Sequence, residues 1–305
     1  MTDKNVPQFF INAFYESKFR DSLFIVKASG AVVEDESALD HLMADIQELT
    51  LLGIKVVFVY GGGELLDRAV EERGLGVKRE NGRRVTDQAT LDLMKEVIGG
   101  SLSLKIYQSM ARHNIEGLSL NAVPYDWLNI SLRPKAPVDF GFVGDIHSAN
   151  VRPVRRLLKS VNFVAVPCLA WAADTAGEGT LCNINADTIA TELAIGTQAN
   201  KLIFMSNVDG VQIGSETAFV ITSEEIEGLI ENGTVTGGMQ VKLENCRRAM
   251  EAGVRRIHLI NGLREHALHK EIFESVGPGT MLLKESERRH YMNEVEAQKA
   301  IGGRA

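Results

Sequence analysis

The sequence predicts an α/β protein of three layers, in which helices cover both faces of a mainly parallel central sheet. Short β-rich runs alternate with helical stretches along the whole chain. The β-rich runs are continuously apolar, which is typical of strands buried on both faces. A chain of 305 residues, 45% of them hydrophobic, is long enough to build one such sheet or two smaller units.

The predicted strands are apolar runs bounded by Gly, Asn or Asp: Leu23–Ala28, Ile54–Tyr60, Leu118–Ala122, Asn162–Pro167, Lys201–Asn207, Arg255–Ile260 and Thr280–Lys284. The predicted helices lie between them: Glu36–Leu52, Gly63–Arg73, Asp87–His113, Asp187–Gln198, Ser223–Glu231, Met239–Ala252 and Arg264–Ser275. Two stretches depart from this alternation. The Asn-Gly pair within 78–86 predicts a hairpin, and the proline-containing β-like pieces of 128–151 predict an inserted hairpin or lid.

A Gly-rich segment near residues 174–183 is the best candidate for a boundary. We expect it to separate two lobes of one continuous sheet, residues 21–175 and 176–284. Residues 1–20 carry Phe9, Phe10, Phe14 and Tyr15 on one face of a predicted helical segment. Residues 285–305 form a charged tail, whose last part is expected to fray.

Composition excludes several classes of protein. The net charge of −7 disfavours a protein that coats nucleic acid, although a local basic pocket remains possible. No apolar run approaches the roughly 20 residues that span a bilayer, and the N-terminus lacks the order of a secretory signal. The cysteines are widely spaced and form neither a zinc pattern nor a disulfide framework, so we interpret them as core residues of a reduced, cytoplasmic protein.

Two glycine-containing turns follow predicted strands. The first strand ends in Lys27 and Ala28, and Ser29 and Gly30 follow. This pattern suits an anionic group close to the backbone, or an ordinary turn with a solvated lysine. After the second strand come Gly61, Gly62 and Gly63, just before a helix. The start of a helix presents free N–H groups and the positive end of the helix dipole, although a tight turn alone also favours glycine.

Polar residues gather before another predicted helix. Asn183, Asn185 and Asp187 are spaced to line one side of an extended approach, or Asp187 simply begins the helix. On the predicted hairpin, Arg83 and Arg84 point to opposite faces, so at most one of them binds a ligand. An arginine fork suits a carboxylate, and the alternative is a solvated surface arginine.

A second lysine lies near the start of a helix. Lys242 would meet the positive dipole end of the helix that begins near Met239, and a bound anion would relieve that cost. Another strand ends at Ser206 and Asn207, followed by a turn that contains Gly210. Ligands of open α/β sheets bind outside such carboxyl ends.

Together these groups predict phosphoryl transfer, which needs mainly positioning and charge neutralisation. A Mg²⁺ ion would be held by the phosphates of the nucleotide and by water, so we expect no protein metal cage. A hydroxyl acceptor would usually need a general base, whereas a carboxylate is already ionised at pH 7. An acyl phosphate product therefore fits this set of residues. His266 and His269 are interpreted as surface or regulatory residues rather than metal ligands.

The chain resembles the amino-acid kinase superfamily and, within it, N-acetylglutamate kinase. The resemblance covers residues 8 to 284 and is carried by "VKASG", "VYGGG", "NGRRVTD", "GFVGDI", "CNINADTIATELA", "SNVDGV", "TGGMQVK" and "EIFESVGPGTMLL". It implies the amino-acid kinase fold, with the acyl acceptor in the first lobe and ATP in the second.

The resemblance also implies the roles of single residues. Lys27 would neutralise the γ-phosphoryl group in flight, Lys242 would stabilise the leaving oxygen of ADP, and Asp187 would orient both lysines. The other implied site residues are Gly30 and Gly62 as N–H donors, Gly61 and Gly63 beside them, Arg84, Asn183 and Asn185 at the acceptor, and Ser206, Asn207, Gly210 and Met239 near adenosine.

The same resemblance implies regulation. Residues 1–20 are similar to a helix that links dimers into hexamers in arginine-inhibited acetylglutamate kinases, so we expect a homo-oligomer, either a dimer or a hexamer. Glu271, Gly277 and Gly279 match the arginine site of these enzymes, although a plain final helix and strand would also explain them. The expected partners are thus small molecules and arginine, with no nucleic acid or membrane.

Three departures from the family pattern leave an alternative open. Ser29 replaces a glycine, Tyr60 replaces a histidine, and Asn207 stands where aspartate is common. Tyr60 and residues 253–273 resemble the kinase-like domain of N-acetylglutamate synthase, in which this domain senses arginine without transferring phosphate. Under this alternative, the chain would be a catalytically silent arginine-sensing module. A third interpretation is a kinase for N-acetyl-aminoadipate, aspartate or glutamate.

Overall fold

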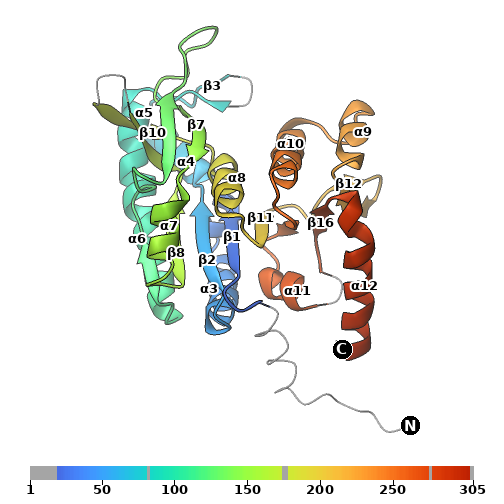
Figure 1. The fold of residues 1–305 in the computed structure, drawn as a ribbon. Coiled ribbons are helices and arrows are strands. Elements are labelled where there is room, and N and C mark those ends of the chain that lie inside the picture. Colours follow the sequence, from blue (N-terminus) through green and yellow to red (C-terminus); the bar gives the residue numbers. More distant parts are fainter. Residues whose placement is uncertain (1–18, 81–82, 174–177, 275–276, 303–305) are drawn as a thin grey trace.

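The computed structural model describes residues 19–80, 83–173, 178–274 and 277–302, with the backbone alone for 297–302. One sheet of eight strands runs through the molecule in the order β14-β16-β15-β11-β1-β2-β8-β5 (Figure 1). Its strands are β1 (Leu23–Ala28), β2 (Lys55–Tyr60), β5 (Gly117–Ser119), β8 (Phe163–Pro167), β11 (Lys201–Ser206), β14 (Val220–Thr222), β15 (Ile257–Asn261) and β16 (Thr280–Leu283). Neighbours pair in parallel, except for the antiparallel pair β15–β16.

Helices connect these strands and cover the sheet. They are α2 (Gly30–Glu34), α3 (Glu36–Leu51), α4 (Gly63–Glu72), α5 (Gln88–Met94), the π-helical η1 (Lys95–Leu102), α6 (Ser103–Arg112), α7 (Val151–Leu157), α8 (Ala186–Thr197), α9 (Glu225–Glu231), α10 (Gly237–Glu251), α11 (Ala267–Phe273) and α12 (Glu285–Gly302). On one face α3 packs with α6 and α11, and on the other face α8 packs with α7 and α10.

Four antiparallel strand pairs lie outside the main sheet. They are β3 (Arg79–Glu80) with β4 (Arg83–Arg84), β6 (Leu128–Leu132) with β7 (Gly144–Ala149), β9 (Leu169–Ala173) with β10 (Gly179–Asn183), and β12 (Gln212–Ile213) with β13 (Glu216–Thr217). The labels β3, β7 and β10 gather at the carboxyl end of β2, at the top of Figure 1. These hairpins therefore cover the carboxyl ends of the strands in the N-terminal part of the sheet.

The predicted three-layer fold is confirmed, including both hairpins. All predicted strands belong to the sheet, and the apolar runs of β1 and β2 are buried on both faces. The edge strand β5 is shorter than predicted, and its Leu118 is 39% exposed. The short strand β14 was missed, since three residues carry no period that sequence alone can detect. The β1–β11 pairing joins the two expected lobes in one continuous sheet. The N-terminal segment 1–18 lies outside the described residues.

The helix expected over residues 87–113 is confirmed as one continuous helical run, α5, η1 and α6. Its middle part, η1, is π-helical and packs against the second glycine turn, which the sequence did not predict. The short helices α2 and α7 were missed.

The three cysteines are buried and free, which confirms their interpretation as core residues. None of the helices within the described ranges is long and apolar enough to cross a membrane.

Residues 285–302 of the charged tail form α12. Of the last part, 294–305, which was expected to fray, residues 294–302 are helical, and 303–305 lie outside the described residues. Tyr291 and Val295 are 8% and 2% exposed, and they pack in a small cluster with Met281 and Leu283. Arg256 of the sheet binds Glu294 with two contacts of 3.1 Å and stacks on the Tyr291 ring at 4.9 Å. The expectation failed because charged residues on the outer face of α12 hide the two apolar positions that anchor it.

Truncation of the buried ring tests this packing. Tyr291→Ala should lower the free energy of unfolding by about 3 kcal/mol, since it removes a buried aromatic side chain and leaves a cavity. Met292→Ala is the matched control, because Met292 is 41% exposed and should cost less than about 0.5 kcal/mol. Urea denaturation measures both variants, and an equal, small effect would mean that α12 does not pack as described.

Candidate active site

Three charged side chains from distant elements meet at the carboxyl end of the sheet. Lys27 lies one residue before the end of β1, Asp187 lies in the first turn of α8, and Lys242 lies in the second turn of α10. The Lys27 Nζ atom is 2.7 Å from Asp187 Oδ1, and the Lys242 Nζ atom is 2.7 Å from Asp187 Oδ2. One carboxylate thus holds two ammonium groups, one on each oxygen.

Burial makes this arrangement electrostatically strong. The Lys27, Lys242 and Asp187 side chains are 10%, 12% and 18% exposed. Burial lowers the pKa of Lys27, with Lys242 acting in the same direction and Asp187 against it. Burial alone would raise the pKa of Asp187, but the two ammonium groups outweigh it and hold that pKa below its ordinary value. The cluster keeps an excess positive charge for an anionic ligand.

Two helix starts with glycine turns lie beside this cluster. A methyl group on Gly30 would be 3.2 Å from the Gly63 nitrogen, and one on Gly61 would be 3.7 Å from Ala186 Cβ. The N-termini of α2, α4 and α8 therefore converge, and each brings the positive end of a helix dipole. A methyl group on Gly62 would lie 2.3 Å from Ile98 Cδ1 and 2.9 Å from Leu102 Cδ2, so a larger residue there would displace these side chains of η1.

The departures at residues 29 and 60 do not disturb this geometry. Ser29 has φ −72° and is the N-cap residue of α2, so its backbone is extended and no left-handed conformation is required. The buried Tyr60 ring stacks on Phe58, and its hydroxyl lies 3.5 Å from the Leu120 oxygen. Burial raises the pKa of Tyr60 to about 12. The ring therefore packs in the core and does not face the charged cluster.

Arg84 and Asn183 lie on the other side of the glycine turn. As predicted, the hairpin turns one arginine inward: the Arg84 side chain is 9% exposed, and Arg83 is exposed. Arg84 donates to Gly63 O at 2.9 Å and binds Asp67 of α4. Asn183 Nδ2 donates to Thr86 Oγ1 at 3.1 Å, two residues beyond Arg84. These contacts bring the predicted acceptor residues together.

The sequence analysis missed Asp67, the acid that binds Arg84. Asp67 lies one helical turn after Gly63, and that spacing was a signal for an acid on the same face of α4. Asn185 was predicted at the substrate, and its side-chain oxygen caps α8 by accepting from Asp187 N at 2.8 Å and Thr188 N at 3.2 Å. Asn185 thus fixes the start of the helix that carries Asp187.

The predicted nucleotide residues lie beyond Lys242. The Lys242 ammonium also lies 4.7 Å from the Phe204 ring centroid, and Ser206 ends the same strand. Met239 is half-buried in the first turn of α10, and Asn207 is exposed. Gly210 has φ +126° and packs against Thr280, so glycine there serves the backbone conformation.

The donor set around the cluster suits phosphate oxygens rather than a bare metal ion. Among the residues that the structure describes, no three His, Cys, Asp or Glu side chains are placed to hold a metal ion. Ammonium groups and helix N-termini bind phosphate, and a magnesium ion would reach such a site together with a nucleotide. His266 and His269 bind Asp45 and Glu48 of α3 at 2.6 Å each.

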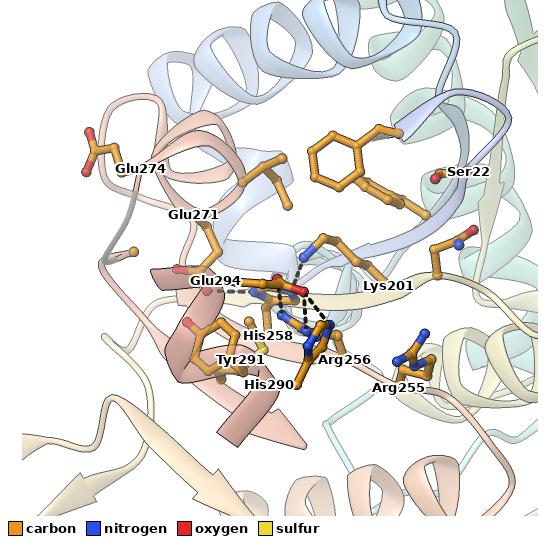
Figure 2. A pocket seen from close by; sticks show the side chains of 16 residues that line it. Ser22, Lys201, Arg255, Arg256, His258, Glu271, Glu274, His290, Tyr291 and Glu294 are labelled. Atoms are coloured by element: carbon orange, nitrogen blue, oxygen red, sulfur yellow. Dashed lines mark hydrogen bonds and ion pairs between the residues drawn. The ribbon is translucent and has the colours of Figure 1, made fainter. Parts of the chain in front are cut away.

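A cavity of about 200 Å³ lies elsewhere, between the start of β15, the end of α11 and α12. Figure 2 shows its polar wall, where Lys201, His258 and Glu271 form a chain of contacts. The Glu271 side chain is 4% exposed, and it accepts from Gly279 N at 3.3 Å. A methyl group on Gly277 would lie 2.1 Å from Glu271 Oε2, so the three predicted effector residues are in contact.

The buried His258 makes the free energy of unfolding depend on pH. Burial, followed by the nearby Lys201, lowers the pKa of His258 from 6.5 to about 4, although Glu271 opposes the shift. Between these values the unfolded chain binds the proton and the folded protein does not. Stability should therefore fall as pH drops from 6.5 to about 4, by on the order of 3 kcal/mol.

Two measurements check this pH dependence. NMR of the imidazole should show that His258 stays neutral until about pH 4. Urea unfolding across the same range should lose part of its slope in His258→Asn, which cannot titrate. An imidazole that titrates near its ordinary pKa would contradict the expected burial.

Comparisons with known proteins show the family of the chain. A model of the amino acid kinase family matches residues 22–261. The chain is similar to acetylglutamate kinase from Pseudothermotoga lettingae, at 35% identity over 92% of this chain and 99% of that one. It is also similar to acetylglutamate kinase from Chlorobium chlorochromatii, at 30% identity over 88% of this chain and 92% of that one.

Among solved structures, N-acetylglutamate synthase from Neisseria gonorrhoeae has a similar fold. Its complex with coenzyme A and N-acetyl-glutamate gives a TM-score of 0.80 at 23% identity and covers 98% of this chain and 70% of that one. Its complex with coenzyme A and L-arginine gives a TM-score of 0.78. With the family model matching most of the chain and the buried charged cluster at the expected place, the protein belongs to the amino acid kinase family and is a kinase.

Proposed function

We propose that the protein transfers the γ-phosphoryl group of ATP to the side-chain carboxylate of N-acetyl-L-glutamate, in the cytoplasm. The observation that carries this proposal is the pair of 2.7 Å contacts that joins Lys27 and Lys242 to the single carboxylate of Asp187. Phosphoryl transfer spreads negative charge over the migrating group and the leaving oxygen. Two fixed cations on opposite oxygens of one acid match that distribution.

Each group has a definite role in this mechanism. Lys27 balances the charge of the phosphoryl group, and Lys242 balances the charge that develops on the leaving oxygen of ADP. Asp187 stays ionised and keeps both lysines in place, so no reorganisation is needed during the reaction. Main-chain N–H groups at Gly30 and Gly62 would hold the phosphoryl oxygens, because Gly30 begins α2 and Gly62 is the N-cap residue of α4, both beside the cluster.

The acceptor needs no base. The carboxylate of an N-acetylated acidic amino acid is ionised at neutral pH, so its oxygen attacks phosphorus directly. Arg84, with Asn183 beside it, would bind the α-carboxylate and the acetamido group. A methyl group on Gly63 would meet no atom within 4 Å, and one on Gly61 only Ala186 Cβ at 3.7 Å, so this turn leaves room for a ligand. N-acetyl-aminoadipate, aspartate and glutamate differ in length or in the free amino group, and they should fit this pair less well.

The nucleotide would occupy the second lobe. Ser206, Asn207, Gly210 and Met239 surround the end of β11 and the start of α10, next to Lys242. Mg²⁺, held by phosphate oxygens and water, supplies further charge neutralisation when it is bound. The chain itself contributes ammonium groups and helix N-termini around the phosphates.

We also propose that arginine inhibits the enzyme by binding the cavity beside Glu271, Gly277 and Gly279. The cavity combines carboxylates with cationic side chains, which suits a ligand that carries a guanidinium, an ammonium and a carboxylate group. The synthase from Neisseria gonorrhoeae, which shares this fold, forms a complex with L-arginine. Homo-oligomers, as dimers or hexamers, are part of the proposal, and exposed Leu104, Tyr107 and Leu118 near the edge strand β5 support a contact between copies.

A catalytically silent arginine sensor is the competing function. Its motivation was the set of departures at Ser29, Tyr60 and Asn207. Ser29 is unstrained, Tyr60 packs in the core, and both lysines are paired with Asp187. These observations favour an active kinase, and an assay of turnover separates the two functions.

A coupled assay with ATP, Mg²⁺ and N-acetyl-L-glutamate tests the reaction. Lys27→Ala and Lys242→Ala should each lower kcat by about 10²-fold or more, because each removes a charge that is used in the transition state. Lys95→Ala is the control, since Lys95 is 40% exposed and pairs with Asp92 on the surface. Full activity in either site variant would refute the mechanism, and a wild-type protein without turnover would favour the silent sensor.

Calorimetry tests the arginine site. Arginine should bind the wild-type protein and inhibit the kinase assay, whereas Glu271→Gln should weaken binding by about tenfold, through loss of one charged partner. Glu274→Gln offers a nearby control in the same cavity wall. If both variants bind arginine as the wild type does, the effector does not contact Glu271.

A further inference from the structure

A carboxylate that belongs to neither the lysine cluster nor the acceptor pair lies at the junction of the two glycine turns. Glu34 is the last residue of α2, and its side chain is 13% exposed. Its Oε1 atom accepts from Leu65 N of α4 at 2.9 Å, and its Oε2 atom is 2.7 Å from Arg68 Nη2. The contacts therefore join a helix that follows β1 to a helix that follows β2.

The position of Glu34 explains why it reaches this junction. Side chains in a helix tilt toward its N-terminus, and residues four apart lie on the same face. Glu34 is four residues after Gly30, and a methyl group on Gly30 would be 3.0 Å from Glu34 Oε1. The carboxylate thus lies over the first glycine turn while it binds the helix that begins at the second.

Glu34 performs a capping role for α4 from another helix. The N-cap position of α4 is Gly62, which has no side chain to accept from the first turn. A Ser, Asp or Asn at that position would normally accept the third N–H of the helix. Glu34 accepts it instead, at Leu65, so the position in front of α4 can remain glycine and open to a phosphoryl group.

The charge of Glu34 does not itself help an anionic substrate. A carboxylate near a phosphoryl group repels it, and an acid at the C-terminal end of α2 also meets the negative end of that dipole. Arg68 and the N-terminus of α4 offset this charge, and Lys105 Nζ donates to the Glu34 carbonyl oxygen at 2.7 Å. The geometry therefore assigns Glu34 a role in position rather than in charge balance.

We propose that Glu34 is the positioning residue that fixes the N-termini of α2 and α4 at the spacing needed to hold one phosphoryl group. This inference rests on the proposed phosphoryl transfer, because it assigns the two glycine turns to the same migrating group. Loss of the Glu34 bridge would let α4 shift against α2. An error of about 1 Å in such a site costs on the order of 10²-fold in rate.

Two substitutions at Glu34 separate position from charge. Glu34→Ala removes the acceptor for Leu65 N, and it should lower kcat at least about tenfold with KM values for ATP and N-acetyl-L-glutamate within about threefold. Glu34→Gln keeps an oxygen acceptor without the charge, and its kcat should stay within about threefold of wild type. A Gln variant as impaired as the Ala variant would overturn the positional role.

The neighbouring Asp35 provides a matched control. It is the N-cap residue of α3 and accepts from Ala38 N at 2.8 Å, so Asp35→Ala also removes one helix-capping carboxylate. It should lower stability by about 1 kcal/mol, as caps do, and leave kcat close to the wild-type value. Equal kcat losses in Asp35→Ala and Glu34→Ala would mean that Glu34 is only a structural cap, and would overturn the inference.

Amide hydrogen exchange tests the bridge from Glu34 to Leu65 without an assay of turnover. Leu65 N should exchange at least about tenfold faster in Glu34→Ala than in wild type, and at close to the wild-type rate in Glu34→Gln and Asp35→Ala. Unchanged exchange at Leu65 in Glu34→Ala would refute the bridge. A wild-type protein that shows the expected exchange but no phosphorylation of N-acetyl-L-glutamate would refute the proposed function and leave the bridge established.

Discussion

The site depends on one buried carboxylate that holds two ammonium groups. Lys27 lies on β1 and Lys242 on α10, and without Asp187 between them the two buried cations would repel each other. Lys242 acts to lower the pKa of Lys27, and Asp187 opposes that effect. Removing one member of such a buried group is costly, because it leaves an uncompensated charge. The arrangement therefore links β1, α8 and α10 electrostatically while it keeps an excess positive charge.

The parallel sheet explains how distant residues reach this carboxylate. Strands β1 and β11 are parallel neighbours, with Lys27 opposite Phe204, so Lys27 and the end of β11 lie at the same edge of the sheet. The helices that follow β1 and β2, together with α8, then point their N-termini at one place. Their dipoles add to the lysines, and the bridge from Glu34 to Leu65 holds two of these helices together.

The sequence predicted what depends on local rules. Lys27, Asp187 and Lys242 were found because each lies at a strand end or a helix start, and the turn at Gly62 was found from composition. Contacts across the chain were not predictable: Arg84 binds Asp67 across 17 positions, and Glu34 binds Leu65 across 31. The strand β14 and the packing of α12 were missed for a different reason, since their apolar positions are too few to form a period.

The most direct test of the central claim is a crystal structure with ADP, Mg²⁺, aluminium fluoride and N-acetyl-L-glutamate, which together imitate the migrating phosphoryl group. The account predicts that both the Lys27 and Lys242 ammonium groups contact the fluoride complex or the ADP oxygen beside it, with Asp187 still between them. Backbone N–H groups of Gly30 and Gly62 should face the same fluoride complex. A complex bound with either lysine turned away from the fluoride, or with nucleotide outside this edge of the sheet, would contradict the account.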